Sequence, residues 1–320
     1  MQNNMAKKTK GTTLANRKIK DLFFYITLFA LPTLQFLIFY VGVNANSILL
    51  AFQRYKLEVG ANGYQISASL ENFKDGWKLM VEHAYSFKYA FLAFFVSMGI
   101  SFPLALIFSF YIYKKYAFSG IFKVLLFMPS LISGLVFSLL FNYITTDVYQ
   151  FIVQKVTQSD ESVLGLLYNR DTRLGTIIFF NIWCSFGSNL LLFSGGMSGI
   201  DESIVESAQL DGANLLQEFI FITIPMIFPT IKQLIVLAIS GIFGNQFALM
   251  SLYGQMSSHA TELATFGYMM FIWSTKSALV VSNGLSYGIL SAIGLLLTIV
   301  TLPVTLLVRK ALDKWGPRTE

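Results

Sequence analysis

Apolar residues along the chain gather into six long runs that are separated by more polar segments. A helix needs about 20 mostly apolar residues to cross a bilayer. Six segments meet this requirement, at roughly 22–50, 88–113, 121–144, 174–198, 228–250 and 285–308. The first run is long and contains Pro32, so its helix is expected to kink or to project beyond the membrane. The pattern therefore predicts an all-α membrane protein with six transmembrane helices.

Lys and Arg residues favour placing both chain termini in the cytoplasm. With the N-terminus inside, the inner segments hold 13 Lys and Arg residues. The outer segments 51–87, 145–173 and 251–284 hold eight, or nine with Lys88 at the start of the second apolar run. The outer segments are much longer, so the positive charge per residue is higher on the inside, which is the usual bias of membrane proteins. Because the outer segments mix aromatic with polar residues, we expect partial helix or interfacial structure there.

One membrane unit with short tails is the simplest domain organisation. Residues 1–20 are expected to form a basic cytoplasmic tail, 21–87 the first transmembrane helix and an outer loop, 88–310 the main transmembrane domain, and 311–320 a second cytoplasmic tail. The first apolar run is too long for a signal-peptide core and lacks a clear cleavage site. It is therefore expected to stay as an uncleaved membrane helix.

Composition supports the membrane class and excludes several others. The chain is 55% hydrophobic and only 12% charged, whereas soluble domains carry roughly 25% charged residues. The net charge of +6 is spread over the ends of the apolar runs, which argues against a nucleic-acid surface. The single Cys184 excludes an intrachain disulfide framework. His83 and His259 lie far apart in loops, so we expect two solvated side chains and no metal site.

The segment between the fourth and fifth apolar runs is the most informative part of the chain. From Asp201 to Met226 it holds five acids and no Lys or Arg, and we call it the acidic loop. Its pattern fits two short amphipathic helices, the first with Ile204, Val205 and Ala208 on one face and a break at Asp211-Gly212. The second is expected to begin with a capping box at Asn214 and Gln217 and to end at Pro225. Such an exposed helix–turn–helix suits a docking partner.

The acidic loop resembles the "EAA" signature of the permease subunits of binding-protein-dependent ABC importers, E-A-A-x3-G-x9-I-x-L-P. The chain reads Glu206-Ser207-Ala208, three residues, Gly212, nine residues, and Ile222-Thr223-Ile224-Pro225. Every spacing matches, and only Ser207 and Ile224 differ from the pattern. The longer form, with Asp211-Gly212-Ala213 and Phe219, is most similar to the sugar-permease branch of the maltose and multiple-sugar type. The element Leu70-Glu71-Asn72-Phe73 also resembles one that precedes the second helix in sugar permeases.

This resemblance implies a fold, a mechanism and partners. The fold is that of type I ABC importer permeases, with a cytoplasmic coupling helix between spans 4 and 5 and the permease domain at 88–310. The partners are a second homologous permease, two ATP-binding subunits and an extracytoplasmic solute-binding protein in a bacterial cytoplasmic membrane. Transport proceeds by alternating access. The residues that the resemblance assigns to ATPase coupling are Glu206, Ser207, Ala208, Asp211, Gly212, Ala213, Ile222 and Pro225.

The chain itself carries no machinery for ATP chemistry or for enzymatic catalysis. It has no G-x4-G-K-[ST] phosphate loop, so it should neither bind nor hydrolyse ATP. We therefore expect no cofactor in this subunit, with ATP bound by its partners, and we expect no enzymatic activity.

Polar residues inside the apolar runs are neutral. Lys88, Lys123 and Lys232 lie near predicted edges, and no acid or other base is expected at membrane depth. Amides and hydroxyls beside aromatic rings suit a sugar, although they also suit hydrogen bonding between helices. The candidate substrate-binding residues are Tyr143, Asn181, Trp183, Ser185, Asn189, Asn245 and Gln246.

Three alternatives to a carbohydrate importer subunit stay open. The first is an ABC permease for another small solute such as glycerol phosphate, although the uncharged spans disfavour a phosphate ester. The second is a secondary carrier or channel that works alone, which the acidic loop and the absence of intramembrane charge disfavour. The third is a scaffold that does not transport.

Overall fold

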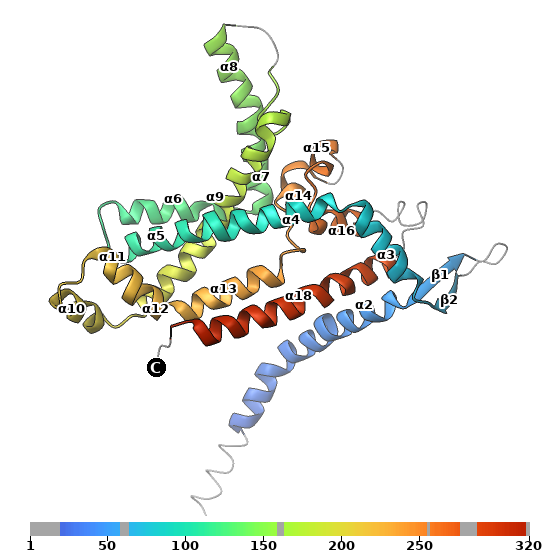
Figure 1. Ribbon diagram of the computed structural model, residues 1–320, viewed down its shortest axis with the longest axis horizontal. Helices are drawn as coiled ribbons and strands as arrows, with labels where there is room; N and C mark the ends of the chain where they lie inside the picture. Colours follow the sequence, from blue (N-terminus) through green and yellow to red (C-terminus); the bar gives the residue numbers. More distant parts are fainter. Residues whose placement is uncertain (1–19, 58–63, 159–162, 255–256, 276–286, 318–320) are drawn as a thin grey trace, which may run out of the picture. The chain divides into compact units, whose positions relative to one another are not determined.

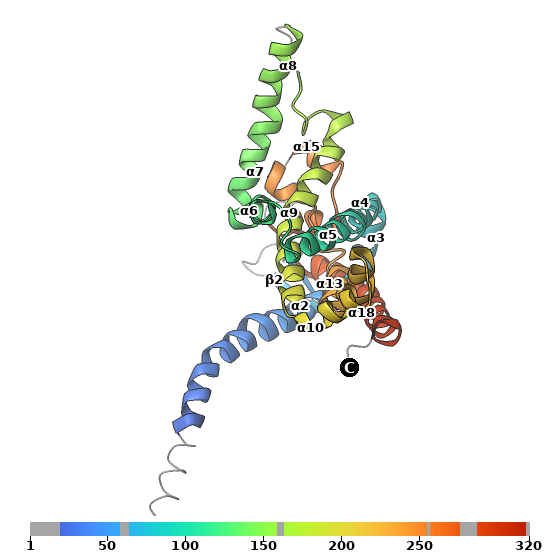
Figure 2. The same ribbon diagram turned by 90° about the vertical axis from the view of Figure 1, so that its left-hand side faces the viewer.

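The computed structural model describes residues 20–57, 64–158, 163–254, 257–275 and 287–317 (Figure 1, Figure 2). Contacts divide the chain into two compact units: unit 1 is Met1–Gly76 with Ser286–Leu295, and unit 2 is Trp77–Leu285 with Leu296–Glu320. Within the described residues, five helices are long and apolar enough to cross a membrane, or up to six if one bent pair is a single span. The all-α membrane fold predicted from the apolar runs is confirmed.

Unit 1 begins with a long apolar helix, Lys20–Ala51, which includes a π-helical stretch η1 (Phe36–Gly42) and ends with α2 (Val43–Ala51). The helix passes through Pro32 without a break. At 1.5 Å per residue it is about 48 Å long, whereas the hydrocarbon core of a bilayer is about 30 Å thick. The helix is therefore long enough to project beyond the membrane, which is one of the two outcomes expected for the first apolar run.

The outer loop of unit 1 contains a small β-hairpin that the sequence did not predict. Strands β1 (Gln53–Leu57) and β2 (Tyr64–Ala68) pair antiparallel, with Gln53 opposite Ala68. Helix α3 (Glu71–Glu82) follows, and its buried Asn72 donates hydrogen bonds to the carbonyl oxygens of Ala51 (3.1 Å) and Gln53 (2.8 Å). Asn72 thus satisfies the last carbonyl of α2, where a helix leaves acceptors without partners, and the first carbonyl of β1.

Unit 2 holds the remaining helices, and α9 lies at its centre beside α5 and α6 (Figure 1, Figure 2). The last helix, α18 (Tyr287–Trp315), starts in unit 1 and continues in unit 2. The other helices of unit 2 are α4 (Tyr85–Val96), η2 (Ser97–Ser101), α5 (Phe102–Tyr113), α6 (Ser119–Leu131), α7 (Gly134–Tyr143), η3 (Ile144–Val148), α8 (Tyr149–Thr157), α9 (Arg170–Ser198), α10 (Glu202–Leu210), α11 (Leu215–Glu218), η4 (Phe219–Thr223), α12 (Ile224–Met226), α13 (Phe228–Ser240), α14 (Leu249–Tyr253), α15 (Ser258–Thr261) and α16 (Phe266–Thr275).

Two apolar clusters hold unit 2 together, and α9 contributes to both. One gathers Phe180 of α9 with Phe247 and Tyr268, and the other gathers Phe193 of α9 with Phe102. Between the clusters Gly187 allows α6 to approach, since a Cβ there would lie only 2.9 Å from the carbonyl oxygen of Leu126. Helix α9 is therefore the element against which the others of this unit pack.

The third predicted span, 121–144, is not one helix. Helix α6 ends at Leu131, the backbone of Ile132 and Ser133 is extended, and α7 begins at Gly134. From there α7, η3 and α8 run on as one 24-residue helix, Gly134–Thr157. The prediction of a single helix was wrong because both sides of the break are equally apolar, so hydropathy does not register the change of direction.

The fifth predicted span, 228–250, is also shorter than expected. Helix α13 ends at Ser240, and turns follow as far as α14, with positive φ angles at Phe247 (52°) and Ala248 (55°). At its other end α13 meets α12 at an angle of 68°. Pro229 lies in the first turn of α13, where its missing N–H costs no hydrogen bond.

The two histidines are half-buried, so the expectation of solvated side chains was wrong. The His83 ring meets the edge of Trp273 at 5.1 Å between ring centres, and the His259 ring meets Tyr168 at 5.5 Å. The predicted basic tail, apart from Lys20, lies outside the described residues. The outer segments do contain the partial helix that was expected, in α3, α8 and α14–α16.

Candidate functional site

The first helix of the acidic loop, α10, follows the C-terminal end of α9 and begins with a side-chain cap. The Asp201 carboxylate accepts a hydrogen bond from the backbone N–H of Ser203 (3.0 Å), which satisfies a free donor of the first turn. This hydrogen bond lowers the pKa of the Asp201 carboxyl. Of the three residues expected on the apolar face, Val205 is buried, Ala208 is half-buried and Ile204 is exposed. The face that α10 buries is therefore narrower than predicted.

The Asp211-Gly212-Ala213 part of the signature forms the turn that ends α10. The N–H of Ala213 donates to the carbonyl of Ala208 (2.9 Å), and the N–H of Gly212 donates to that of Gln209 (3.1 Å). These two bonds are those of a Schellman motif, which requires a left-handed residue after the helix. Gly212 has φ +85°, as the predicted break requires. The signature thus has a glycine at this position because the turn that ends α10 needs a left-handed residue.

The second helix of the loop begins as predicted and ends one residue later than predicted. The Asn214 side chain accepts from the Gln217 N–H (2.9 Å), and the Gln217 side chain accepts from the Asn214 N–H (2.8 Å). The chain then passes through α11, the π-helical η4 and α12 to Met226, so the end expected at Pro225 was wrong. A π-helical turn precedes Pro225, and such wider turns accompany local departures from the regular helical hydrogen-bond ladder.

The capping box gives a first prediction. Asn214→Ala should weaken the start of α11 by about 1 kcal/mol, which is about a fivefold change in the local opening equilibrium. Hydrogen–deuterium exchange of the amides just after Asn214 should become faster by that factor. Asn214→Asp keeps the side-chain acceptor and should exchange at the wild-type rate. Equal exchange in Asn214→Ala and the wild type would contradict a stabilising cap.

Five of the eight predicted coupling residues line one hollow of about 370 Å³ between the two helices of the loop. They are Ala208, Asp211, Gly212, Ala213 and Ile222, and Gln217 and Phe221 complete the lining. The other three, Glu206, Ser207 and Pro225, lie outside this lining: Glu206 and Ser207 are exposed on α10, and Pro225 is half-buried in α12. The spacing of the signature therefore brings most of its residues to one concave surface.

The surface around this hollow combines exposed apolar side chains with negative charge. Leu210 is 89% exposed, Phe221 72% and Leu216 64%. The exposed acids Glu202, Glu206 and Asp211 stand among them. An exposed apolar patch with a polar rim is typical of an interaction site.

The fifth acid of the loop, Glu218, is not on this surface. It is 2% exposed, and its carboxylate forms an ion pair with the Lys114 ammonium at the end of α5 (2.5 Å). Beside this pair the rings of Phe110 and Phe219 lie 4.8 Å apart between their centres. From the sequence, Glu218 was counted with the acids of the loop, and Lys114 with the Lys and Arg residues that indicate the membrane orientation. Nothing in the sequence indicated that these two residues form an ion pair.

A second feature of unit 2 is a polar pocket of about 310 Å³ lined from α4, η2 and α9, which we call the membrane pocket. Three of the seven candidate substrate residues line it: Asn181, Ser185 and Asn245. A neighbouring pocket of about 440 Å³ shares Ser97 and Asn245 with it. The residues that line the two pockets are all uncharged, as expected for a neutral solute.

Several side chains that line the membrane pocket form hydrogen bonds with other residues of the chain. The Asn181 amide donates to the carbonyl oxygens of Ile177 (2.9 Å) and Phe247 (3.1 Å). Asn245 accepts from the Phe247 N–H (2.8 Å), which leaves its own NH₂ group to donate elsewhere. The Ser185 hydroxyl pairs with that of Ser101 (2.6 Å). Asn181 thus links α9 to the turn that precedes α14, whereas the NH₂ group of Asn245 donates to none of the described residues.

The other four candidates do not line the membrane pocket. Tyr143 is 58% exposed on α7, and Trp183 packs against Phe137 at 5.0 Å between ring centres. Asn189 lies two turns beyond Asn181 on α9, and Gln246 follows the Asn245 turn. The residues that sequence reasoning missed are Ser97, Ser101 and Cys184. Ser97 and Ser101 are four residues apart in an apolar run, and this spacing could have predicted that both lie on one helix face.

The fold and these two features define a polytopic helical membrane protein with an exposed acidic loop. Residues 83–315 match the family described as "binding-protein-dependent transport system inner membrane component", and the chain belongs to this family. The predicted resemblance to importer permeases is therefore confirmed, and the family is one of transport components, not of enzymes.

Curated relatives and solved structures support the same class. The chain is 27% identical over 292 residues to the arabinooligosaccharides transport system permease protein AraP of Bacillus subtilis (strain 168), covering 88% of the chain and 86% of that protein. It is 29% identical over 189 residues to the multiple sugar-binding transport system permease protein MsmF of Streptococcus mutans, covering 56% and 58%. A bacterial ABC transporter for import of the acidic polysaccharide alginate has the same fold, with a TM-score of 0.69 at 18% identity over 94% of this chain and 99% of that one.

Proposed function

We propose that the chain is the transmembrane permease subunit of an ATP-driven importer for a sugar or oligosaccharide. The observation that carries the ATP-driven part is the acidic loop, in which signature residues meet in one hollow on an exposed surface. The names of the relatives support the carbohydrate part, since AraP and MsmF are sugar-transport permeases. The uncharged membrane pocket favours a neutral sugar over a phosphate ester.

A separate ATPase docks on the acidic loop in this proposal. The loop offers exposed leucines and phenylalanine among acids, so its partner should present an apolar groove with basic residues at the rim. The chain lacks a phosphate loop, and energy must therefore come from such a partner. Closure of two ATPase subunits then moves the permease helices as rigid bodies between inward- and outward-open states.

The remaining partners are a second, homologous permease and an extracytoplasmic solute-binding protein. The family name supports a binding protein, and a related alginate transporter was solved in complex with a periplasmic protein that holds an alginate pentasaccharide. Both termini lie in the cytoplasm in this proposal, in agreement with the charge bias. This orientation puts the acidic loop on the side where ATP is available.

Purification of the tagged chain from its native membranes in mild detergent tests the proposal. Mass spectrometry should identify an ATPase, a second permease and a solute-binding protein with the chain. The complex, reconstituted in proteoliposomes, should take up a labelled neutral oligosaccharide only when ATP is enclosed. Uptake by the purified chain alone, without any ATPase, would favour a stand-alone carrier instead.

Asn245 gives a prediction for the membrane pocket. Asn245→Asp keeps the oxygen that accepts from the Phe247 N–H and removes the NH₂ donor, so the turn should persist. Loss of one hydrogen bond to a sugar, together with an unpaired charge, should raise the KM for uptake about tenfold or more. Asn189→Asp makes the same chemical change on α9 outside the pocket lining and should leave the KM within about twofold. Equal KM values for the two variants would show that Asn245 does not bind the solute.

A further inference from the structure

A small apolar hollow lies where the C-terminal end of α18 runs beside the start of α13, and we call it the C-terminal hollow (Figure 1). Its volume is about 260 Å³. No charged residue lines it, and the lining residues used below are Phe228, Val308, Ala311, Leu312, Trp315 and Gly316. None of these residues lines the hollow of the acidic loop or the membrane pocket.

Two contacts join α13 to the end of α18 at this hollow. The Lys232 ammonium of α13 donates to the Asp313 carboxylate of α18 at 2.7 Å. Just after α18 the chain passes so close to the Phe228 ring that a Cβ at Gly316 would collide with this ring. The walls of the C-terminal hollow therefore belong to packed elements of unit 2.

Basic residues border the apolar wall of the hollow on both sides. The wall on α18 consists of four residues that share one helix face by their spacing of i, i+3, i+4 and i+7: Val308, Ala311, Leu312 and Trp315. With about 100° of rotation per residue, Arg309 borders this face on one side and Lys314 on the other. Both side chains are exposed, and neither forms an ion pair with a described residue.

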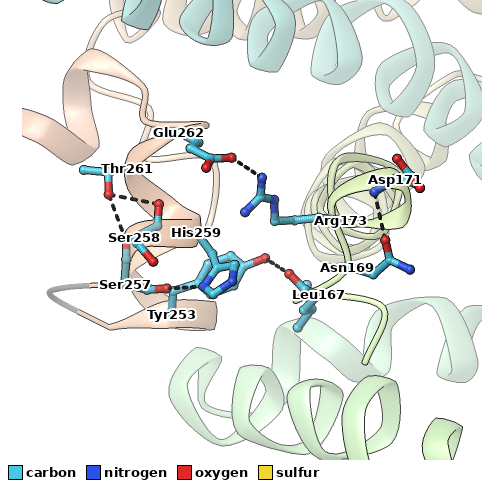
Figure 3. Close-up of polar contacts among 10 residues, drawn as sticks. All are labelled: Leu167, Asn169, Asp171, Arg173, Tyr253, Ser257, Ser258, His259, Thr261 and Glu262. Atoms are coloured by element: carbon cyan, nitrogen blue, oxygen red, sulfur yellow. Dashed lines mark hydrogen bonds and ion pairs between the residues drawn. The ribbon is translucent and has the colours of Figure 1, made fainter. Parts of the chain in front are cut away.

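A buried arginine of the same unit shows the contrast. Arg173 is only 4% exposed, and its guanidinium donates to the Glu262 carboxylate at 2.5 Å, as Figure 3 shows. The charge of Arg173 is therefore matched inside the chain. The charges of Arg309 and Lys314 are accessible from outside.

The C-terminal hollow lies where α18 is expected to leave the hydrocarbon layer. The last apolar run ends at Val308, and Leu302, Leu306 and Leu307 before it are exposed as lipid-facing residues would be. The 29 residues of α18 are about 44 Å long, whereas the hydrocarbon core is about 30 Å thick, so the last turns reach the headgroup layer. Trp315 is 80% exposed, and tryptophan is enriched at this level of a bilayer.

The combination of an apolar hollow with two flanking cations selects a class of ligand. Hydrocarbon suits the lining, and a phosphate between Arg309 and Lys314 would accept charge-assisted hydrogen bonds. An anionic phospholipid carries both parts and has no cation of its own. A zwitterionic lipid carries an ammonium group that the two side chains repel, and basic sites at the inner ends of membrane helices favour anionic headgroups.

Protein occupants fit this surface less well. The ATPase proposed to dock on the acidic loop needs basic residues at its rim, and these would meet like charge at Arg309 and Lys314. A second copy of the chain would bring the same cations to the contact. Charge complementarity therefore favours a lipid.

We propose that the C-terminal hollow binds one anionic phospholipid, with an acyl chain against Phe228 and Leu312 and the phosphate between Arg309 and Lys314. In the orientation proposed above, this lipid lies in the cytoplasmic leaflet. It joins α13 to α18 in addition to the ion pair of Lys232 with Asp313. The site does not depend on which solute the chain carries.

Photolabelling in nanodiscs tests the lipid site directly. The full complex is placed in phosphatidylcholine nanodiscs with a trace of phosphatidylglycerol that carries a diazirine on an acyl chain close to the glycerol. After irradiation, mass spectrometry should find label on segment 308–317 or on Phe228. Unlabelled phosphatidylglycerol should lower this labelling saturably, whereas extra phosphatidylcholine should not. Equal competition by the two lipids would reject a site for anionic lipid.

Three variants separate the parts of the site. Arg309→Gln with Lys314→Gln should raise the phosphatidylglycerol concentration for half-competition at least about tenfold, since each cation near an anionic headgroup contributes roughly fivefold. Lys310→Gln removes the same charge from the opposite face of α18 and should change this concentration by less than about threefold. Ala311→Phe fills the hollow, keeps both cations and should abolish the saturable labelling. Unaltered labelling in Ala311→Phe would overturn the placement of the acyl chain.

An internal reference shows that each variant is inserted and folded. Helix α6 exposes Val124 and Leu125, which should take up a low, non-saturable label that is equal in all variants. Displacement of the label by inorganic phosphate alone would overturn the part of the acyl chain in binding.

Other outcomes separate the lipid site from the proposed function. If the complex takes up sugar with ATP while segment 308–317 shows no preference for phosphatidylglycerol, the lipid site is rejected and the permease function stands. Labelling of the isolated chain that disappears when ATPase subunits are bound would make the hollow a protein-docking surface and reject the lipid.

Discussion

Gly212→Val should lower ATP-driven uptake at least tenfold, whereas Gly212→Asn should keep most of it. Gly212 has φ +85°, and no atom lies within 4 Å of the position that a Cβ would take. A side chain at this position would therefore meet no steric clash within the chain, and its effect on the loop would come from the backbone conformation alone. A left-handed conformation costs an L-residue roughly 1–2 kcal/mol, more for a β-branched one, while asparagine tolerates it.

The reason for the large effect is that the turn sets the angle between the two helices of the acidic loop. The Schellman hydrogen bonds of Gly212 and Ala213 end α10, and the capping box at Asn214 begins α11 directly afterwards. A cost of 1.4 kcal/mol or more lowers the equilibrium constant for forming this turn at least tenfold. Without this turn the hollow lined by the signature residues does not form, and the surface proposed to bind the ATPase is lost.

The measurement is uptake and ATP hydrolysis by the reconstituted complex, with membrane insertion checked by protease protection. Normal uptake by Gly212→Val would show that the turn conformation is not needed. Failure of Gly212→Asn, with normal exchange protection of α10 and α11, would indicate instead that the partner approaches Gly212 too closely for any side chain. Either result identifies which property of glycine the loop uses.

The features that the sequence predicted correctly are those encoded by residues close together in the chain. The left-handed Gly212 and the capping box at Asn214 each depend on residues within a few positions of one another. The long apolar runs likewise reveal membrane helices, because the bilayer requires a continuous apolar length. These local signals place the acidic loop and most of the spans.

The features that were missed depend on partners far apart in the chain or on the rotation of a helix. The ion pairs Arg173–Glu262 and Lys114–Glu218 join residues of different helices, and hydropathy contains no information on which charges meet. An apolar run also does not show which face a helix turns inward. Asn181 and Asn189 therefore looked alike in sequence, although only Asn181 lines the membrane pocket.

Lys114→Met should uncouple ATP hydrolysis from transport, because it leaves a buried carboxylate without its partner. Glu218 is 2% exposed, and its only ion pair among the described residues is with Lys114. Removal of one partner from a buried pair typically costs about 3–5 kcal/mol. The pair joins the second helix of the acidic loop to the end of α5, so this cost falls on the attachment of the loop to the membrane helices.

A double-mutant cycle separates the effect of the ion pair from the effects of substituting Lys114 or Glu218 alone. Lys114→Met with Glu218→Gln removes both charges, so the burial cost disappears and uptake should recover at least tenfold relative to Lys114→Met alone. Lys232→Met is the matched control. Its ion pair with Asp313 (2.7 Å) is far less buried, with side chains 34% and 47% exposed, and should contribute less than about 1 kcal/mol.

The readout that distinguishes attachment from docking is the ratio of ATP hydrolysed to sugar taken up. If the acidic loop still binds the ATPase but is loosely held to α5, Lys114→Met should hydrolyse ATP and move little sugar. Loss of both activities together with loss of the ATPase on purification would instead place the pair in the docking surface. The burial of Glu218 beneath the exposed apolar face of the loop argues for the first result, because a partner that covers Leu216 and Phe221 does not reach this carboxylate. The contact between the rings of Phe110 and Phe219 lies beside the ion pair and gives the same link an apolar component. In the proposed mechanism, motion of the loop reaches α5 through both contacts.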